Sequence, residues 1–171
     1  MRRVIASILF ACASPAMASA QPTRPAGVST IGPWEAVQWV RGRTVSRCTL
    51  IRETKAAGTP GYGFLVDREG VLLSVETPAW KLTPDVAVAA TLTPQAAGIR
   101  RFSAKPVSAE RANIDISKDR AMLDDLQKSE RLEVQIGGVK VDLPFDDFNA
   151  ARVVLEICVQ KIGTEFRADA R

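Results

Sequence analysis

Residues 148–163, FNAARVVLEICVQKIG, are the segment that does most to determine the fold. Apolar side chains recur in it at spacings of three and four, which places them on one face of a helix: Phe148, Ala151, Leu155, Cys158 and Ile162. Asp146 or Asp147 can cap the start of this helix, and Gly163 marks its end. The pattern predicts an amphipathic helix whose cysteine points into a hydrophobic core.

The N-terminus, MRRVIASILFACASPAMASA, has the layout of a secretory signal peptide. Two arginines precede a short apolar run, and Ala18-Ser19-Ala20 forms a small-residue cleavage site. We expect cleavage after Ala20, so that the mature chain begins at Gln21. The alternative is a lipoprotein signal in which Leu9-Phe10-Ala11-Cys12 leads to lipidation of Cys12, although Phe10 is bulky for such a signal. In both cases the protein leaves the cytoplasm.

Two of the three cysteines, Cys48 and Cys158, remain after cleavage. Cys48 lies in TVSRCTLI, residues 44–51, a β-branched run typical of a strand. Two cysteines in an oxidising compartment most simply form one disulfide, which here joins an early strand to the last helix. The alternative is a catalytic thiol, but the sequence contains no histidine to activate it.

The rest of the chain predicts mainly β structure. LEVQIGGVKVDL, residues 132–143, alternates on both sides of Gly137-Gly138 and predicts a two-residue hairpin. Further strands are predicted over residues 34–40, 63–75 around a turn at 67–70, 86–92, 99–104 and 112–116, with a short helix over 118–129. Around eight strands favour an antiparallel β-sandwich or curled sheet with the C-terminal α-helix packed on it.

Composition suggests one domain. Residues 21–31 are rich in proline and polar residues and predict a flexible lead-in, residues 32–165 form a single β-rich domain, and residues 166–171 are a tail. The chain has 23 basic and 19 acidic residues, and loss of Arg2 and Arg3 leaves 21 against 19, a net charge of +2. This charge is too small for a general nucleic-acid binder, and no second apolar run predicts a transmembrane helix after processing.

The sequence contains none of the catalytic or metal-binding motifs that we considered. Without histidine, Ser-His-Asp triads, Cys-His pairs and histidine-ligated metals are excluded, and no serine is followed three positions later by lysine. Asp115, Ser117 and Asp119 resemble the start of a calcium loop, but Arg120 replaces its glycine, so a strand end with Ser117 capping the following helix is the better interpretation. We therefore expect no enzyme activity, no metal and no cofactor.

Two basic groups and one tryptophan are candidates for a binding surface. The first basic group lies along two early strands and consists of Arg41, Arg43, Arg47 and Arg52, with Lys55 just beyond. The second group consists of Arg100, Arg101 and Lys105. Trp80 lies near a proline-bounded turn. The basic residues could meet an acidic partner or anionic envelope lipid, while an ordinary solvated surface is the alternative. Trp80 could serve as a ligand platform, while a place in the core, as for Trp34 and Trp39, is the favoured alternative.

The order of these segments resembles the invasion-associated locus B family of exported bacterial proteins. The resemblance is carried by GPWEAV (32–37), SRCTL (46–50), VLLSVETPAWKLTPDVAV (71–88) and VKVDLPFDDFNAARVVLEIC (139–158). It implies a non-enzymatic, periplasmic or envelope-associated β-sandwich in a Gram-negative bacterium.

The function expected from these observations is an exported domain that binds an unknown protein or envelope component. A small secreted hydrolase inhibitor that presents residues 57–63 as a rigid loop is the alternative, and an enzyme with carboxylate or Ser-Lys chemistry is a third. The ligand and the oligomeric state do not follow from the sequence.

Overall fold

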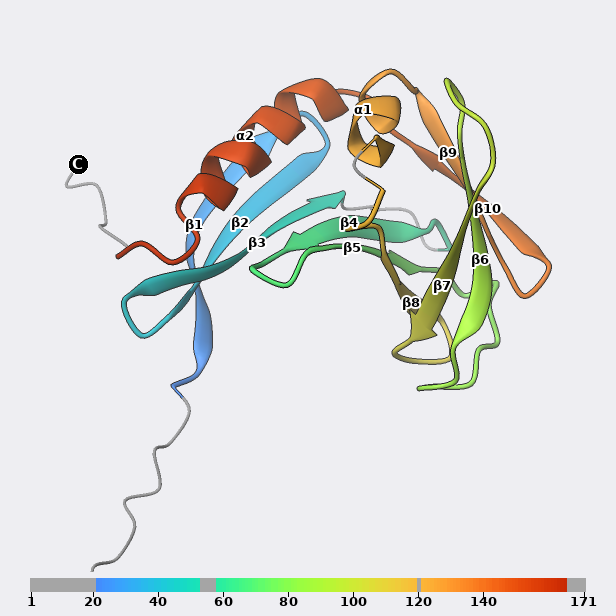
Figure 1. Ribbon diagram of the computed structural model, residues 1–171, viewed down its shortest axis with the longest axis horizontal. Helices are drawn as coiled ribbons and strands as arrows, with labels where there is room; N and C mark the ends of the chain where they lie inside the picture. Colours follow the sequence, from blue (N-terminus) through green and yellow to red (C-terminus); the bar gives the residue numbers. More distant parts are fainter. Residues whose placement is uncertain (1–20, 53–57, 120, 166–171) are drawn as a thin grey trace, which may run out of the picture.

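The computed structural model describes residues 21–52, 58–119 and 121–165, and its main element is one antiparallel sheet of ten strands (Figure 1). The signal peptide, Cys12, Lys55 and the tail at 166–171 lie outside the described residues. The strands are β1 (Thr23–Ile31), β2 (Trp34–Arg41), β3 (Thr44–Arg52), β4 (Gly61–Val66), β5 (Val71–Glu76), β6 (Val88–Pro94), β7 (Arg100–Pro106), β8 (Arg111–Asp115), β9 (Arg131–Ile136) and β10 (Val139–Pro144). The helices are α1 (Met122–Gln127) and α2 (Phe148–Gln160).

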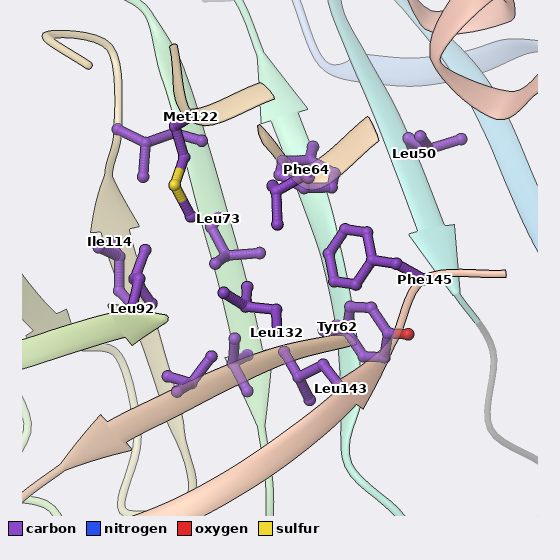
Figure 2. Packing of buried hydrophobic residues seen from close by; sticks show 14 of the residues in the cluster. Leu50, Tyr62, Phe64, Leu73, Leu92, Ile114, Met122, Leu132, Leu143 and Phe145 are labelled. Atoms are coloured by element: carbon purple, nitrogen blue, oxygen red, sulfur yellow. The ribbon is translucent and has the colours of Figure 1, made fainter. Parts of the chain in front are cut away.

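The sheet curls so that its two halves face one another across a single core. Its strand order is β1-β2-β3-β4-β5-β8-β7-β6-β9-β10, and we call β1–β5 the first half-sheet and β6–β10 the second. Leu50, Phe64 and Leu73 of the first half belong to one buried cluster with residues of the second half such as Leu132 and Leu143 (Figure 2). The fold class and the hairpin at Gly137-Gly138 are confirmed.

Helix α2 covers the inner side of β2 and β3, as Figure 1 shows. Its buried residues are the ones that the periodicity predicts: Phe148, Ala151, Leu155 and Cys158. Cys158 forms a disulfide with Cys48 of β3, with the two Cα atoms 6.1 Å apart. The predicted link between an early strand and the last helix is therefore present.

The predicted carboxylate cap of α2 is wrong. Asp147 occupies the N-cap position but has a left-handed backbone, with φ of 58°, and its side chain makes no capping hydrogen bond. That carboxylate instead lies against Gly32, in the turn between β1 and β2, where an added Cβ would come within 2.6 Å of it. The Asp146 carboxylate points to Arg52, and its backbone carbonyl accepts a hydrogen bond from the Trp34 indole at 2.7 Å.

Residues 23–31 form edge strand β1, so the predicted flexible lead-in is wrong for them. They pair with β2 from Thr23↔Arg41 to Ile31↔Trp34, with a register shift between Pro25 and Gly27. Proline is tolerated here because an edge strand can lack a backbone donor, particularly at a bulge.

Ser117 does not cap α1, which begins five residues later and has Ala121 at its N-cap position. The Ser117 hydroxyl accepts a hydrogen bond from the Val71 amide at 2.8 Å and donates one to Asp115. The hydrogen bond from the Ser117 hydroxyl is the largest cause that lowers the pKa of Asp115, and a bond from the Ser117 backbone amide to the same carboxylate, at 2.9 Å, lowers it further. Ser117 therefore ties the end of β8 to the start of β5.

Candidate functional site

The predicted basic cluster does not form one surface, because Arg52 is taken into the structure. Only 12% of its side chain is exposed. Its guanidinium donates to the Pro144 carbonyl at 3.0 Å, pairs with Asp146 at 2.8 Å and lies over the Trp34 ring at 5.8 Å. Arg52 thus links β3 of the first half-sheet to the end of β10, and its guanidinium is engaged inside the protein and does not join Arg41, Arg43 and Arg47 in one basic surface.

Trp80 and Arg100 are also wrong as surface candidates. Trp80 is 1% exposed, because its indole lies in the core. The segment after β5 turns inward there, and the Trp80 amide donates a hydrogen bond to the Thr77 carbonyl at 3.3 Å. Arg100 forms ion pairs with Asp119 and Asp125, and about a fifth of its side chain is exposed. Both pairs stabilise the segment that carries α1.

The remaining candidates lie in two separate places. Arg41, Arg43 and Arg47 gather where β2 turns into β3; Arg43 pairs with Glu165 at 2.8 Å, and Arg47 lies 4.9 Å from the ring centre of Trp39. Arg101 is exposed on β7 of the second half-sheet. The two predicted basic groups therefore contain residues that have the same charge but do not lie on one surface.

A different candidate surface appears on the outer face of the first half-sheet, the face turned away from the core. Strand alternation there places apolar side chains outward on every strand: Val28, Val37, Trp39, Ile51, Leu65 and Leu72. The row Val28↔Val37↔Thr49↔Leu65↔Leu72 crosses five strands, with Thr49 as its polar member and Val37 buried within it. Trp39 and Ile51 lie two residues along their strands from this row. We call this set the apolar stripe.

A cavity of about 620 Å³ lies over the stripe where β3, β4, β5 and β8 meet, and we call it the outer hollow. Ile51 and Leu65 line it, together with Ser74 and the glycines at 61 and 63. At Gly61 an added Cβ would meet no atom within 4 Å, so the hollow exists partly because this strand position has no side chain. At Gly63 an added Cβ would come within 2.4 Å of the Leu50 carbonyl oxygen, so close strand packing requires glycine there.

The rim of the outer hollow carries one pair of opposite charges. Arg111 of β8 lies 3.8 Å from Glu76 of β5, and about half of each side chain is exposed. The pair adds donors and an acceptor to a depression that Ile51 and Leu65 share with the polar residues Thr49, Arg52 and Ser74. Such a combination, an apolar base with a few polar groups at its edge, is typical of binding sites.

Tyr62 lies on the opposite face of β4 from the hollow and belongs to the core. It packs with Trp34, Phe145 and their neighbours, with ring centres 5.6 to 5.7 Å apart. Its hydroxyl donates to the Pro144 carbonyl. Burial raises the pKa of Tyr62, Arg52 counteracts that rise, and Asp146 adds to it. Tyr62 and Arg52 together form a seam between the two half-sheets at Pro144.

Two further findings concern the described residues alone. They contain no group of three histidine, cysteine, aspartate or glutamate side chains arranged to hold a metal ion. None of their helices is both long enough and apolar enough to cross a membrane.

The outer hollow was not predicted from the sequence, because residues 55–63 were assigned to a turn or loop. The signal was present in residues 61–66, GYGFLV, where Tyr62, Phe64 and Val66 alternate with Gly61, Gly63 and Leu65. The first set faces the core, and the second set faces outward. The same alternation shows that Gly61 and Gly63 belong to strand β4, so the loop predicted for 57–63 is wrong over 61–63, and residue 57 lies outside the described residues.

Comparison with known proteins agrees with this architecture. No protein-family model and no curated protein sequence matches the chain. A solved structure does match: the crystal structure of invasion associated protein B from Bartonella henselae superposes with a TM-score of 0.52 at 13% sequence identity, over 77% of this chain and 97% of that one. The chain therefore has the fold of invasion associated protein B, the fold that the sequence resemblance implied.

Proposed function

We propose that this chain is an exported, non-enzymatic binding domain of the bacterial envelope or periplasm. It binds a protein partner through the outer face of the first half-sheet, with an apolar side chain of the partner seated in the outer hollow. The observation that carries the proposal is the apolar stripe, which runs across five strands and ends at a cavity.

Export is supported by the disulfide and the N-terminal pattern. The Cys48–Cys158 bond joins residues 110 positions apart, and bonds of this kind persist in oxidising compartments. The first twenty residues have the charge and apolar pattern of a signal peptide. The mass of the mature protein distinguishes cleavage after Ala20 from lipidation at Cys12.

A protein partner is favoured by the shape and chemistry of the surface. Val28 is 59% exposed and Ile51 is 37% exposed, and Trp39, Leu65 and Leu72 are partly exposed, so this face offers apolar area that a protein partner can bury. The stripe extends from β1 to β5, well beyond the hollow itself. Arg111 and Glu76 at the rim offer a donor and an acceptor to peptide groups that flank an inserted side chain.

Photo-crosslinking from the hollow tests the proposal. A crosslinking amino acid at Ile51 is expected to capture one protein in the envelope of cells that express the chain, whereas the same amino acid at Thr91, on the outer face of β6, captures none. Gly61→Val fills the open space without backbone strain and should reduce capture at least tenfold, since it blocks the inserted side chain.

Gly98→Val is the matched control, because an added Cβ at Gly98 also meets no atom within 4 Å but lies between β6 and β7. It should leave capture unchanged. Two results would show that the outer hollow is not the binding site. One is equal capture from Ile51 and Thr91. The other is capture that persists in Gly61→Val when this variant has the same free energy of unfolding as the natural chain.

A further inference from the structure

The two edges of the sheet differ in how well they are protected against pairing with another strand. An edge strand presents unpaired backbone donors and acceptors, and natural sheets protect such edges with charges, proline, bulges or covering segments. The edges here are β1 and β10. Their sequences and contacts show that only one of them is fully protected.

Edge β10 carries two of these protections. Lys140 and Asp142 are exposed charged residues in a strand of six, and Lys140 also pairs with Glu133 at 3.0 Å. At the end of the strand the Pro144 carbonyl accepts hydrogen bonds from Tyr62 and Arg52. An added strand would have to pass these charges and displace the seam.

Edge β1 is open over Gly27–Ile31, whose sequence GVSTI contains no charge and no proline. Its protection, Pro25 and the register shift, lies before this segment. Within the described residues, β1 pairs with β2 alone. Val28 is 59% exposed and begins the apolar stripe, so a strand added at this edge would extend the stripe by one more side chain.

Positive charge lies at the other end of the same edge. Arg24 is exposed on β1, Arg41 lies opposite Thr23 on the neighbouring strand β2, and Arg47 lies one strand further, opposite Trp39, on β3. Among the described residues, none of these three guanidinium groups forms an ion pair. Strand β1 itself contains no acidic residue, so a second copy of β1 would bring no carboxylate to Arg24.

We propose that the free edge of β1 accepts an extended segment of a partner protein as an eleventh, antiparallel strand. An apolar side chain of this segment lies beside Val28. A carboxylate nearer the C-terminal end of the segment lies beside Arg24. The antiparallel direction continues the arrangement of the whole sheet, and backbone hydrogen bonds to Gly27–Ile31 supply its affinity. This inference depends on the edge and not on the outer hollow.

A random peptide library displayed on phage tests the inference with the mature chain. Selected peptides should alternate apolar and polar residues and carry Asp or Glu near the C-terminal end. Hydrogen exchange should slow at alternate amides of Gly27–Ile31 when such a peptide binds, namely those whose N–H groups point away from β2, because these donors have no strand partner until the peptide adds on that side. Peptides that bind without slowing exchange there would overturn the inference. A chain that dimerises through β1 would do so too, because a second copy would then occupy the edge.

Exchange of charge between chain and peptide gives an independent readout. Arg24→Glu should weaken binding of a selected acidic peptide at least fivefold, and a peptide with Lys in place of its acidic residue should recover that loss. Arg101→Glu, on the second half-sheet, should change neither affinity. Equal losses from both variants would show non-specific attraction and contradict the assignment of Arg24.

The two proposals fail separately. Gly61→Val removes the outer hollow but leaves Gly27–Ile31 intact, so peptide binding at the edge should persist in that variant. Methylation of every second peptide nitrogen removes backbone hydrogen bonds and retains the side chains. Of the two alternate methylation patterns, one should abolish binding and the other should preserve it, because an added strand bonds along one edge only.

Discussion

Along its outer face the first half-sheet presents Val28, Ile51 and Leu65 among polar residues such as Glu35 and Thr49, whereas the second half-sheet presents Thr91, Arg101 and Glu133. Both halves turn equally apolar side chains into the shared core, including Leu50 and Leu132. The remaining outward positions of the second half are almost all polar: Thr93, Ser103, Lys105, Gln135, Lys140 and Asp142. Ala89 is the small exception.

The second half-sheet follows the ordinary pattern of an antiparallel sheet with one dry and one wet face. The first half-sheet departs from it, and α2 does not explain the departure, because the helix covers the inner side of β2 and β3 through Cys158 and Leu155. The apolar stripe is therefore not needed to bury the helix or to close the core. Its cost in water is consistent with a surface that another molecule covers.

The largest expected effect is loss of the disulfide, which joins α2 to β3 of the first half-sheet. The double substitution Cys48→Ala and Cys158→Ala should lower the free energy of unfolding by about 4–5 kcal/mol, because the bond closes a long loop in the unfolded chain. Urea unfolding measures the change. Reduction of the natural chain should give the same loss and should not affect the double variant; equal stability of all forms would show that the bond is dispensable.

The features that the sequence predicts well are local. The hairpin 132–143 and the helix 148–160 follow from periodicities within a few residues, and the disulfide follows from compartment and helix face. Strand β1 was missed because Pro25 and its polar neighbours have the composition of a loop, and pairing with β2 overrides that preference.

The candidate site depended on contacts between distant segments, which the sequence does not show directly. The outer hollow needs the register of β3, β4 and β5, which brings Ile51 opposite Gly63 and Gly63 opposite Ser74. Arg100 was grouped with Arg101 by charge, but its two carboxylate partners lie 19 and 25 residues further along the chain. Only strand alternation at residues 61–66 offered an early signal.

Within the second half-sheet, the neighbouring residues Arg100 and Arg101 should behave differently. Arg100→Gln should lower the free energy of unfolding by about 2 kcal/mol, because it leaves the partly buried Asp119 and Asp125 without their common partner. Arg101→Gln, at an exposed site, should change it by less than about 0.5 kcal/mol. Urea unfolding of both variants checks the difference, and equal values would show that the Arg100 ion pairs contribute nothing.

At the seam between the halves, Tyr62→Phe should lower the free energy of unfolding by about 1 kcal/mol, since the Pro144 carbonyl loses one donor and keeps Arg52. Tyr62 is the single tyrosine of the chain, so its ionisation can be followed directly by ultraviolet absorbance. Unfolded chain should ionise at a pKa of about 10. In the folded chain the Tyr62 phenol should remain un-ionised at that pH, because burial raises the pKa of Tyr62.

The sign of the linkage follows from that shift. The folded state holds the phenol proton more tightly than the unfolded state, so the contribution of Tyr62 is fully present below pH of about 10 and is lost as the pH rises above it. The Tyr62→Phe variant should show a weaker alkaline decline in stability than the natural chain. Ionisation of the folded natural chain at the ordinary pKa would show that the seam is open to water.

The smallest effect on stability should come from exchanging the two outer faces, and it separates folding from binding most clearly. Leu65→Thr with Leu72→Thr gives the first half-sheet the outer chemistry of the second, and each change should alter the free energy of unfolding by about 0.5 kcal/mol or less, because neither side chain reaches the core. Crosslinking from Ile51 should nevertheless fall at least tenfold. The reverse exchange, Thr91→Leu with Thr93→Leu, should create no capture from the second half-sheet, which lacks the glycine-lined hollow. If the first exchange instead unfolds the chain, the apolar stripe serves the fold, and the contrast between the two faces no longer points to a partner.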